Sequence, residues 1–208
     1  GCFTQRERES YLPGKFYIKV NSTQKALRDL ARWYKKKFPI PFVAITGSVG
    51  KTTTKDMVAA VLGERFKVLK TEGNFNNEVG LPLTLLRLNG THEICVVEMG
   101  MNHFGEIEYL SAIVEPDVAV ITNIGDSHIE NLGSRENILE AKCEIFSHMD
   151  REKSFVILNG DDPLLAGLRP TLPFETVMVG TAEGLEYRAT DVSADGEKSV
   201  CCHVTTPT

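Results

Sequence analysis

A short glycine-containing segment has the residue types of a phosphate-binding loop. It reads Thr46-Gly47-Ser48-Val49-Gly50-Lys51-Thr52-Thr53 and lies between an apolar run and a helical pattern. Glycines let backbone N–H groups point toward an anion, and the N-terminus of the following helix adds a positive dipole. We expect Lys51 to neutralise phosphate charge and the Thr52 hydroxyl to bind Mg²⁺.

The segment departs from the general nucleotide-binding form G-x-x-x-x-G-K-[ST]. Ile45 stands where the first glycine of that form belongs, so the segment is the shorter G-x-x-G-K-T. The alternative is a glycine-containing turn that carries a surface lysine. The strand and helix expected on either side favour the phosphate-binding interpretation.

A carboxylate and a histidine follow two other apolar runs. Glu98 ends the second run, and Mg²⁺ is usually held by one or two carboxylates together with phosphates. His128 lies just past the third run, in the segment Thr122–His128. The alternatives are an exposed glutamate at a strand end and a solvated histidine in a loop.

Lys142 stands on the apolar stripe of a predicted helix. The stripe has the spacing i, i+4, i+7, i+11 and consists of Ile138, Lys142, Ile145 and Met149. A lysine on the apolar side of a helix is costly unless it is paired or modified. Burial lowers the pKa of an amine, and a neutral amine can react with CO₂ to give a carbamate. The alternative is a side chain that reaches solvent at the edge of the stripe.

Two polar loops could present amides or a histidine to a phosphate, sugar or peptide. One is the segment Gly73–Gly80, expected between a strand and a helix, and the other precedes a helical pattern near residue 105. The candidate substrate residues are Asn74, Asn76, Asn77, Asn102 and His103. The alternatives are a turn for the first loop and a helix cap for the second.

Four apolar runs predict the sheet that positions these residues. They are Phe42–Ile45, Ile94–Val97, Val118–Ile121 and Phe155–Leu158. Each is apolar on both faces, as a parallel strand covered on both sides requires. The next residues are polar, namely Thr46, Glu98, Thr122 and Asn159. Ligands of open α/β sheets bind at this edge, so we expect a doubly wound, mostly parallel α/β sheet with its chemistry there.

Helical patterns fill the intervals between these runs. They cover Lys51–Leu62, Gly105–Ile113, Ser134–Phe146 and roughly Asp161–Leu168. In the first of them we expect the inner side to carry Met57, Val58, Val61 and Leu62.

The two ends of the chain predict further elements. A strand is expected at Phe16–Val20, then a helix over 23–38, capped near Asn21 or Ser22. The apolar face of that helix consists of Leu27, Leu30, Ala31, Tyr34 and Phe38. Pro39 and Pro41 indicate a domain boundary. A β-rich edge of the main domain is expected from Glu175–Val179, Tyr187–Val192 and Val200–Thr205.

The composition limits the class of protein. Of 208 residues, 42% are hydrophobic and 25% are charged, with a formal net charge of −5. These values are typical of a globular chain. The longest apolar run, Met57–Leu62, is too short to span a bilayer, and the negative charge disfavours nucleic-acid binding. Five cysteines without paired spacing indicate reduced thiols in a cytoplasmic protein.

Taken together, these segments resemble the Mur ligase family, and within it the branch that adds D-alanyl-D-alanine. The shortened phosphate loop is this family's form, and the resemblance covers about Lys15 to Leu168. The matching segments are Gly47–Thr52, Gly73–Leu86, Glu98–Ile107, Thr122–His128, Ala141–Phe146 and Asn159–Asp162.

The resemblance implies a role for each matching residue. ATP would be held by Gly47, Ser48, Val49, Gly50, Lys51, Thr52, Thr53 and, at adenine, Asn159. Thr52 and Glu98 would bind the first Mg²⁺, and His128 and a carbamylated Lys142 the second. The catalytic residues would be Lys51, Lys142 and His128. The substrate residues would be the loop asparagines together with Asn102 and His103.

The resemblance also implies an activity, an ATP-dependent ligase of peptidoglycan precursor synthesis and so of cell wall biogenesis, cell shape and cell division. ATP would phosphorylate the terminal carboxylate of UDP-N-acetylmuramoyl-tripeptide, and D-Ala-D-Ala would attack the acyl phosphate. Residues 1–38 would be the end of a smaller α/β UDP-substrate domain plus a linker helix, and 39–208 an incomplete ATP-binding centre. With the C-terminal domain absent, this chain would bind nucleotide without ligating, whereas the full-length protein would be a cytoplasmic monomer.

Three other functions stay open at this point. A P-loop NTPase or phosphotransferase would use the same loop and have no use for a second metal at His128 and Lys142. A non-catalytic nucleotide-binding module would need the loop alone. A neighbouring ligase, of folylpolyglutamate or cyanophycin synthetase type, would share the loop but lack the asparagine-rich segment and the Asn102-His103 pair.

Overall fold

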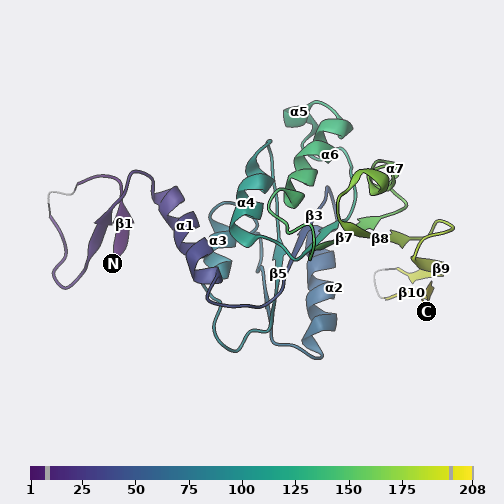
Figure 1. The fold of residues 1–208 in the computed structure, drawn as a ribbon, viewed down its shortest axis with the longest axis horizontal. Coiled ribbons are helices and arrows are strands. Elements are labelled where there is room, and N and C mark those ends of the chain that lie inside the picture. Colours follow the sequence, from purple (N-terminus) through teal and green to yellow (C-terminus); the bar gives the residue numbers. More distant parts are fainter. Residues whose placement is uncertain (8–9, 197–198, 208) are drawn as a thin grey trace.

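The computed structural model describes residues 1–7, 10–196 and 199–207. The main sheet is built from β3 (Phe42–Thr46), β4 (Val68–Lys70), β5 (Ile94–Glu98), β6 (Val118–Ile121), β7 (Phe155–Asn159), β8 (Glu175–Gly180), β9 (Tyr187–Asp195) and β10 (Ser199–Thr205). The strand order is β10-β9-β8-β7-β6-β3-β5-β4. Neighbours are parallel except for the antiparallel pair β9 and β10. The predicted mostly parallel sheet and its β-rich edge are therefore confirmed (Figure 1).

Helices cover both faces of this sheet. They are α1 (Thr23–Lys35), α2 (Lys51–Gly63), α3 (Gly80–Leu85), α4 (Glu106–Val114), α5 (Ile129–Leu132), α6 (Arg135–Cys143) and α7 (Pro163–Ala166). Successive side chains of β3 point to opposite faces: Val43 and Ile45 pack with α2, whereas Phe42 and Ala44 join a larger core with α1, α3, α4 and α6. Because both faces of the sheet are covered, the strands are apolar at every position rather than at alternate positions.

The prediction for the inner side of α2 was wrong in part. Val58 and Leu62 pack against the sheet, but Met57 and Val61 are 66% and 73% exposed. The buried positions of this helix are instead Lys55 and Ala59. A run of six consecutive apolar residues has no polar position to show which side faces the sheet, so its helical phase could not be read correctly.

Other elements differ from prediction in length or were not predicted. The helix expected over Asp161–Leu168 is only the four-residue α7, and the one expected to Phe146 ends as α6 at Cys143 with a 3₁₀ turn over Glu144–Phe146. A second 3₁₀ turn spans Arg169–Thr171. The strand and helix expected on either side of the Gly73–Gly80 loop are β4 and α3, whereas the helix α5 and the strand β1 (Cys2–Thr4) were not predicted.

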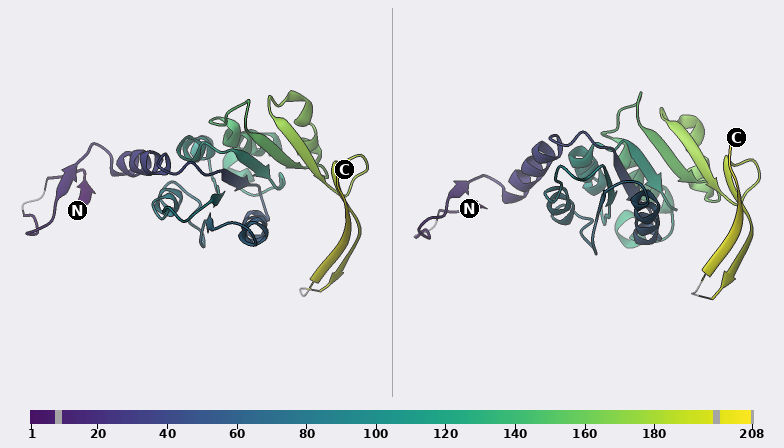
Figure 2. Two further views of the ribbon diagram at one scale, coloured as in Figure 1. Left: turned by 60° about the horizontal axis from the view of Figure 1, so that its bottom comes forward. Right: turned by 90° about the horizontal axis from the view of Figure 1, so that it is seen from below.

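The two ends of the chain lie at opposite sides of the molecule, the N-terminal strands outside the main sheet and the C-terminal strands at its edge. β1 pairs in parallel with β2 (Tyr17–Lys19) in a separate two-stranded sheet. Figure 2 shows this sheet beyond the outer end of α1, and the β9–β10 hairpin at the far side of the molecule. The strand expected at Phe16–Val20 is therefore present, slightly shortened.

The linker helix α1 is anchored on the main core. Its N-cap is Ser22, whose side chain accepts a hydrogen bond from the Lys25 N–H. Ala31 is fully buried in the larger core, and Tyr34 packs against it and donates its hydroxyl to the Leu88 carbonyl at 2.8 Å. Of the predicted apolar face, Ala31, Tyr34 and Phe38 pack on the larger core, and the helix expected to reach residue 38 ends at Lys35, so Phe38 lies just past it.

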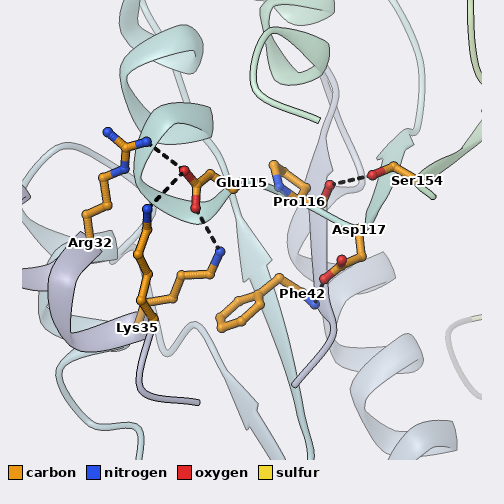
Figure 3. Close-up of polar contacts among 8 residues, drawn as sticks. Arg32, Lys35, Phe42, Glu115, Pro116, Asp117 and Ser154 are labelled. Carbon is orange, nitrogen blue, oxygen red and sulfur yellow. Dashed lines mark hydrogen bonds and ion pairs between the residues drawn. The ribbon is translucent and has the colours of Figure 1, made fainter. Parts of the chain in front are cut away.

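Glu115, just beyond the end of α4, forms the polar part of this anchor (Figure 3). Its carboxylate faces the cations of Arg32 at 2.6 Å, Lys35 at 3.5 Å and Lys36 at 3.8 Å. Lys35 is only 8% exposed, and its ammonium also lies 4.5 Å from the centre of the Phe42 ring. Burial raises the pKa of Glu115, but the Arg32 hydrogen bond and the nearby cations outweigh it and hold that pKa below 4.5. Glu115 therefore joins α1 to α4 as a carboxylate.

We expect Glu115→Gln to destabilise the chain by about 1–2 kcal/mol at neutral pH, because it leaves Lys35 without its carboxylate in a partly solvated cluster. The pKa of Glu115 is lower in the folded than in the unfolded chain, so its ionised carboxylate stabilises the folded state at any pH above the unfolded-state pKa. This stabilisation is lost as the pH falls through the folded-state pKa. The two proteins should therefore converge in acid. Urea unfolding at a series of pH values measures this, with the exposed Glu64→Gln as control; a difference that does not shrink in acid would contradict it.

Candidate functional site

The polar residues that end the central strands meet at one edge of the sheet. In the parallel register Ile45 pairs with Glu98 and Thr46 with Ile121. Thr122 follows directly and donates its N–H to the Thr46 carbonyl at 3.0 Å. β3 lies between β5 and β6, so the chain places later strands on both sides of it. This is the switch point at which open α/β sheets bind ligands.

The loop after β3 has the backbone of an anion-binding site. Gly50 caps α2 in the left-handed region (φ 81°) and provides no side-chain hydrogen bond to the helix. The first N–H groups of a helix have no intrahelical acceptor, and its N-terminus favours negative charge. Because α2 begins at Lys51, these groups face the edge where the strands end.

The segment after β6 holds this loop in place. Asn123 accepts the Ser48 N–H with its carbonyl and the Val49 N–H with its side-chain oxygen, both at 3.0 Å. The Thr122 hydroxyl donates to the Val49 carbonyl at 2.6 Å. Gly47 allows this close approach, since a Cβ there would lie 1.9 Å from the Thr122 hydroxyl oxygen. Thr122 and Asn123 had no predicted role, although Thr122 stood out in the sequence as a polar residue after an apolar run.

Lys51 lies within the loop that it is expected to serve. Its ammonium donates to the Gly47 carbonyl at 2.9 Å and to the Ser48 carbonyl at 3.4 Å. Burial lowers the pKa of Lys51, while the Glu98 carboxylate acts in the opposite direction. A half-buried cation held only by neutral carbonyls suits an anionic ligand.

Glu98 is the centre of a buried polar cluster. It is 2% exposed, and its Oε2 accepts the Thr52 hydroxyl at 2.8 Å. Its Oε1 accepts the Asn76 amide, also at 2.8 Å. The exposed-glutamate alternative is therefore wrong. The structure brings Thr52 and Glu98 together and places Asn76 on this carboxylate rather than in an open cavity.

Lys142 is buried as its helical phase predicted. It is 2% exposed, on the same stripe as the buried Ile138, Ile145 and Met149, so the solvent-reaching alternative is wrong. Burial, with a smaller contribution from the nearby charge of Lys51, lowers the pKa of Lys142 to about 7. Much of this amine is therefore neutral at physiological pH.

His128 lies close enough to both lysines for their charges to act on it. Burial, then the charges of Lys142 and Lys51, lower the pKa of His128. His128 is partly buried rather than solvated and adopts left-handed backbone (φ 67°) at the start of α5. Non-glycine residues in this region cost energy and tend to cluster at functional sites. Three basic side chains thus gather near the phosphate loop.

The oxygen donors of the site fit a small hard cation only in part. A hydroxyl and a carboxylate 2.8 Å apart, at Thr52 and Glu98, are the ligand types that Mg²⁺ takes. Across residues 1–7, 10–196 and 199–207, no three His, Cys, Asp or Glu side chains are grouped to hold a metal. The remaining ligands would have to be phosphate oxygens and water, as is usual for Mg²⁺ at nucleotide sites.

The other predicted substrate residues have different surroundings. Asn77 and Asn102 line a cavity of about 300 Å³, together with Gln24 at the start of α1, a residue that the sequence analysis missed. Asn74 is exposed. His103 is also exposed, with its Nδ1 3.3 Å from a Glu106 carboxylate oxygen. Gln24 lies more than 50 positions before Asn77 in the sequence, and it reaches the cavity only because α1 packs beside it. A local sequence pattern therefore could not identify Gln24 as a cavity residue.

Asn159, predicted to contact adenine, ties two strand ends together. Its amide donates to the Thr122 carbonyl at 3.0 Å, and its side-chain oxygen accepts the Asp161 N–H at 3.0 Å. Asp162 then caps α7 and accepts the Ile124 N–H at 2.7 Å. Asn159 therefore lies at the same edge of the sheet as Glu98 and the phosphate loop.

In the part of the chain that the structure describes, no helix is long and apolar enough to cross a membrane. The five cysteines are free thiols, with Cys95 in β5 and Cys143 at the end of α6.

Comparisons with known proteins agree with this arrangement. The UDP-N-acetylmuramoyl-tripeptide–D-alanyl-D-alanine ligase of Bacillus subtilis (strain 168) is 48% identical over 180 residues, which are 86% of this chain and 38% of that protein. MurF from Acinetobacter baumannii has a TM-score of 0.90 at 33% identity, over 99% of this chain and 44% of the other. MurF ligase from Thermotoga maritima, solved in complex with ADP, has a TM-score of 0.85 at 35% identity, over 98% and 46%.

This chain spans less than half the length of each of these proteins. The family model of the Mur ligase middle domain matches residues 45–207, which include the phosphate loop, Glu98, His128 and Lys142. The 208-residue chain therefore belongs to the Mur ligase family.

Proposed function

We propose that this chain is the ATP-binding part of a ligase that joins D-Ala-D-Ala to UDP-N-acetylmuramoyl-tripeptide. The observation that carries the proposal is the Thr52–Glu98 pair beside Lys51, at the switch point of a parallel sheet. The Bacillus subtilis relative is named for this reaction, and the Thermotoga maritima structure holds ADP. The enzyme would be a cytoplasmic monomer that acts on small-molecule substrates in peptidoglycan synthesis.

The phosphate loop would bind and orient the triphosphate. The free N–H groups at the start of α2 point toward the ligand, and Lys51 exchanges its loop carbonyls for phosphate oxygens. Mg²⁺, held by Thr52 and Glu98, would neutralise charge on the transferring phosphoryl group. Positioning and charge neutralisation are the main demands of phosphoryl transfer.

The chemistry would proceed in two transfers. The tripeptide carboxylate takes the γ-phosphoryl group from ATP and becomes an acyl phosphate, with ADP as the product that leaves. The amine of D-Ala-D-Ala then attacks the acyl carbon, loses a proton and expels phosphate, so that one amide forms for each ATP consumed. Asn77 and Asn102, which line the cavity beside α1, would contact the UDP-linked substrate.

Lys142 would serve this reaction as a carbamate. A buried amine with a pKa near 7 has a large neutral fraction, and that fraction adds CO₂ and releases one proton. The product is an anionic oxygen ligand beside His128 and close to the ammonium of Lys51, whose positive charge favours it. A second Mg²⁺ would be held there by His128 and this carbamate.

The domain organisation supports the same function. We propose that residues 1–38 end the UDP-substrate domain and connect it through α1 to the ATP-binding centre of residues 39–208. The separate β1–β2 sheet supports such a boundary. α1, however, shares its core with the centre, so the two parts meet along a packed helix.

The direct test compares this chain with a full-length protein that contains it. We expect the 208-residue chain to bind Mg²⁺–ATP weakly and to form no amide, because positioning of two reactants accounts for about 7–11 kcal/mol of a barrier. The full-length protein should give the pentapeptide product, seen by mass spectrometry, with phosphate release that depends on D-Ala-D-Ala.

Two outcomes would contradict the proposal. Phosphate release by the full-length protein that ignores D-Ala-D-Ala would indicate an NTPase or phosphotransferase. Pentapeptide formed by the 208-residue chain at a rate of order 1 s⁻¹, within the usual enzyme range, would show that the rest of the protein is not needed for ligation.

A further inference from the structure

The two oxygens of the Glu98 carboxylate have different partners. Oε2 accepts the Thr52 hydroxyl and Oε1 accepts the Asn76 amide, each at 2.8 Å. The backbone N–H of Glu98 donates to the Thr71 hydroxyl at 3.1 Å, and the residue is almost fully buried. The side chain is thus fixed from both sides.

These two partners respond differently to a cation. The Thr52 hydroxyl oxygen has lone pairs, so it can turn from donating to Glu98 to binding a metal beside it. The Asn76 NH₂ group is a donor only and has no lone pair for a cation. A cation that displaces the Thr52–Glu98 contact gains the Thr52 hydroxyl as a ligand. A cation that displaces the Asn76–Glu98 contact gains no ligand from Asn76 and leaves the Asn76 NH₂ donor unpaired.

The backbone around Asn76 holds its amide at Oε1. Gly100 donates its N–H to the Asn76 carbonyl at 2.8 Å, and a Cβ at Gly100 would lie 3.1 Å from both Cγ and Nδ2 of Asn76. At the other end of the loop, a Cβ at Gly80 would lie 2.4 Å from the Phe75 Cα. Two glycines therefore allow the loop to fold back onto the end of β5.

We propose that Asn76 is a positioning residue that reserves Oε1 of Glu98, so that a divalent cation beside Thr52 takes the single oxygen Oε2. The inference rests on the nucleotide–Mg²⁺ site of the proposed function and assigns Asn76 to that site rather than to the UDP-linked substrate. One carboxylate oxygen suits Mg²⁺, which demands octahedral geometry and keeps several waters. Ca²⁺ often takes both oxygens of a carboxylate, so Asn76 disfavours Ca²⁺.

The test measures ATP affinity of this chain by calorimetry, with Mg²⁺ or Ca²⁺ as the only divalent cation. We expect Asn76→Ala to lower the Mg²⁺-supported affinity by roughly 10-fold or more, as is typical when a partner of a metal ligand is removed. Ca²⁺-supported affinity should be unchanged or higher, because Oε1 becomes available. A fall in the ratio of Mg²⁺-supported to Ca²⁺-supported ATP affinity would support the proposal, and an unchanged ratio would contradict it.

Gly100→Ala is the second variant, because its methyl group would lie 3.1 Å from Cγ and Nδ2 of Asn76 and would shift that side chain by a few tenths of an ångström without removing the amide. Gly100→Ala should lower the ratio of Mg²⁺-supported to Ca²⁺-supported ATP affinity, as Asn76→Ala does. It serves as the test variant if Asn76→Ala does not fold. Asn89→Ala, in a surface turn away from Glu98, is the matched control for loss of an asparagine and should leave the ratio unchanged.

Glu98→Gln separates failure of the inference from failure of the proposed function. If it leaves Mg²⁺ dependence intact, the metal site itself is wrong. If it removes that dependence while Asn76→Ala and Gly100→Ala keep the ratio of the parent chain, Asn76 does not position Glu98. A full-length Asn76→Ala protein with a higher KM for the UDP-linked substrate and an unchanged cation ratio would assign Asn76 to substrate instead.

Discussion

Replacing Lys51 with alanine is expected to lower the ATP affinity of this chain at least about 30-fold. Loss of one partner of a buried, hydrogen-bonded charge pair costs about 2–5 kcal/mol, and every 1.4 kcal/mol is about tenfold in affinity. The ammonium already lies inside the loop, 2.9 Å from the Gly47 carbonyl, so it needs little movement to reach a phosphate. Titration with a fluorescent ATP analogue measures the effect.

Two controls make the Lys51 result interpretable. Lys67→Ala removes an exposed lysine at the other edge of the sheet and should leave the affinity unchanged. Adenosine, which lacks phosphates, should bind Lys51→Ala as well as it binds the parent chain. Equal ATP affinity of Lys51→Ala and parent would mean that the loop after β3 is only a turn.

Replacing Lys142 with alanine in the full-length protein should reduce turnover in the proposed ligation roughly 100-fold or more. The expected cause is loss of an anionic ligand to a cation that contributes several kcal/mol of transition-state stabilisation, at about 1.4 kcal/mol for each tenfold in rate. A small carboxylate such as acetate should restore part of the activity, since it can occupy the space of the carbamate. Addition of an amine of similar size should restore none.

The proposed carbamate on Lys142 can also be tested without any turnover. Equilibration of the 208-residue chain with ¹³C-labelled CO₂ should give a carbamate signal by NMR that is absent from Lys142→Ala. The signal should fall in acid, where the amine is protonated and cannot add CO₂. Identical spectra from the two proteins at neutral pH would show that Lys142 stays an unmodified amine.

The strands that carry the site could be predicted almost to the residue. Runs such as Phe42–Ile45 are continuously apolar because both of their faces are covered, and a parallel strand between two layers of helices is the usual source of this pattern. β4 gave no such signal, because it has only three residues and ends at Lys70. Met57 and Val61 were placed on the wrong side because an uninterrupted apolar run carries no helical phase.

In the candidate site, too, features set by local sequence spacing could be predicted, whereas contacts between distant segments could not. The burial of Lys142 followed from local spacing alone, since its neighbours on the stripe are within eleven residues. The contact between Asn76 and Glu98 spans 22 positions and depends on how the loop after β4 folds back over Gly100. A contact of this kind leaves no periodic pattern in the local sequence, so it could not be predicted.

The hydrogen bonds between the phosphate loop and the segment after β6 have a consequence for how the site moves when a ligand arrives. Asn123 and Thr122 hold both backbone polar groups of Val49, and His128 comes only five positions after Asn123. A displacement of the loop is therefore passed to the segment that carries the histidine. Lys51 and His128 should therefore shift together, as one unit, when a nucleotide binds to the loop.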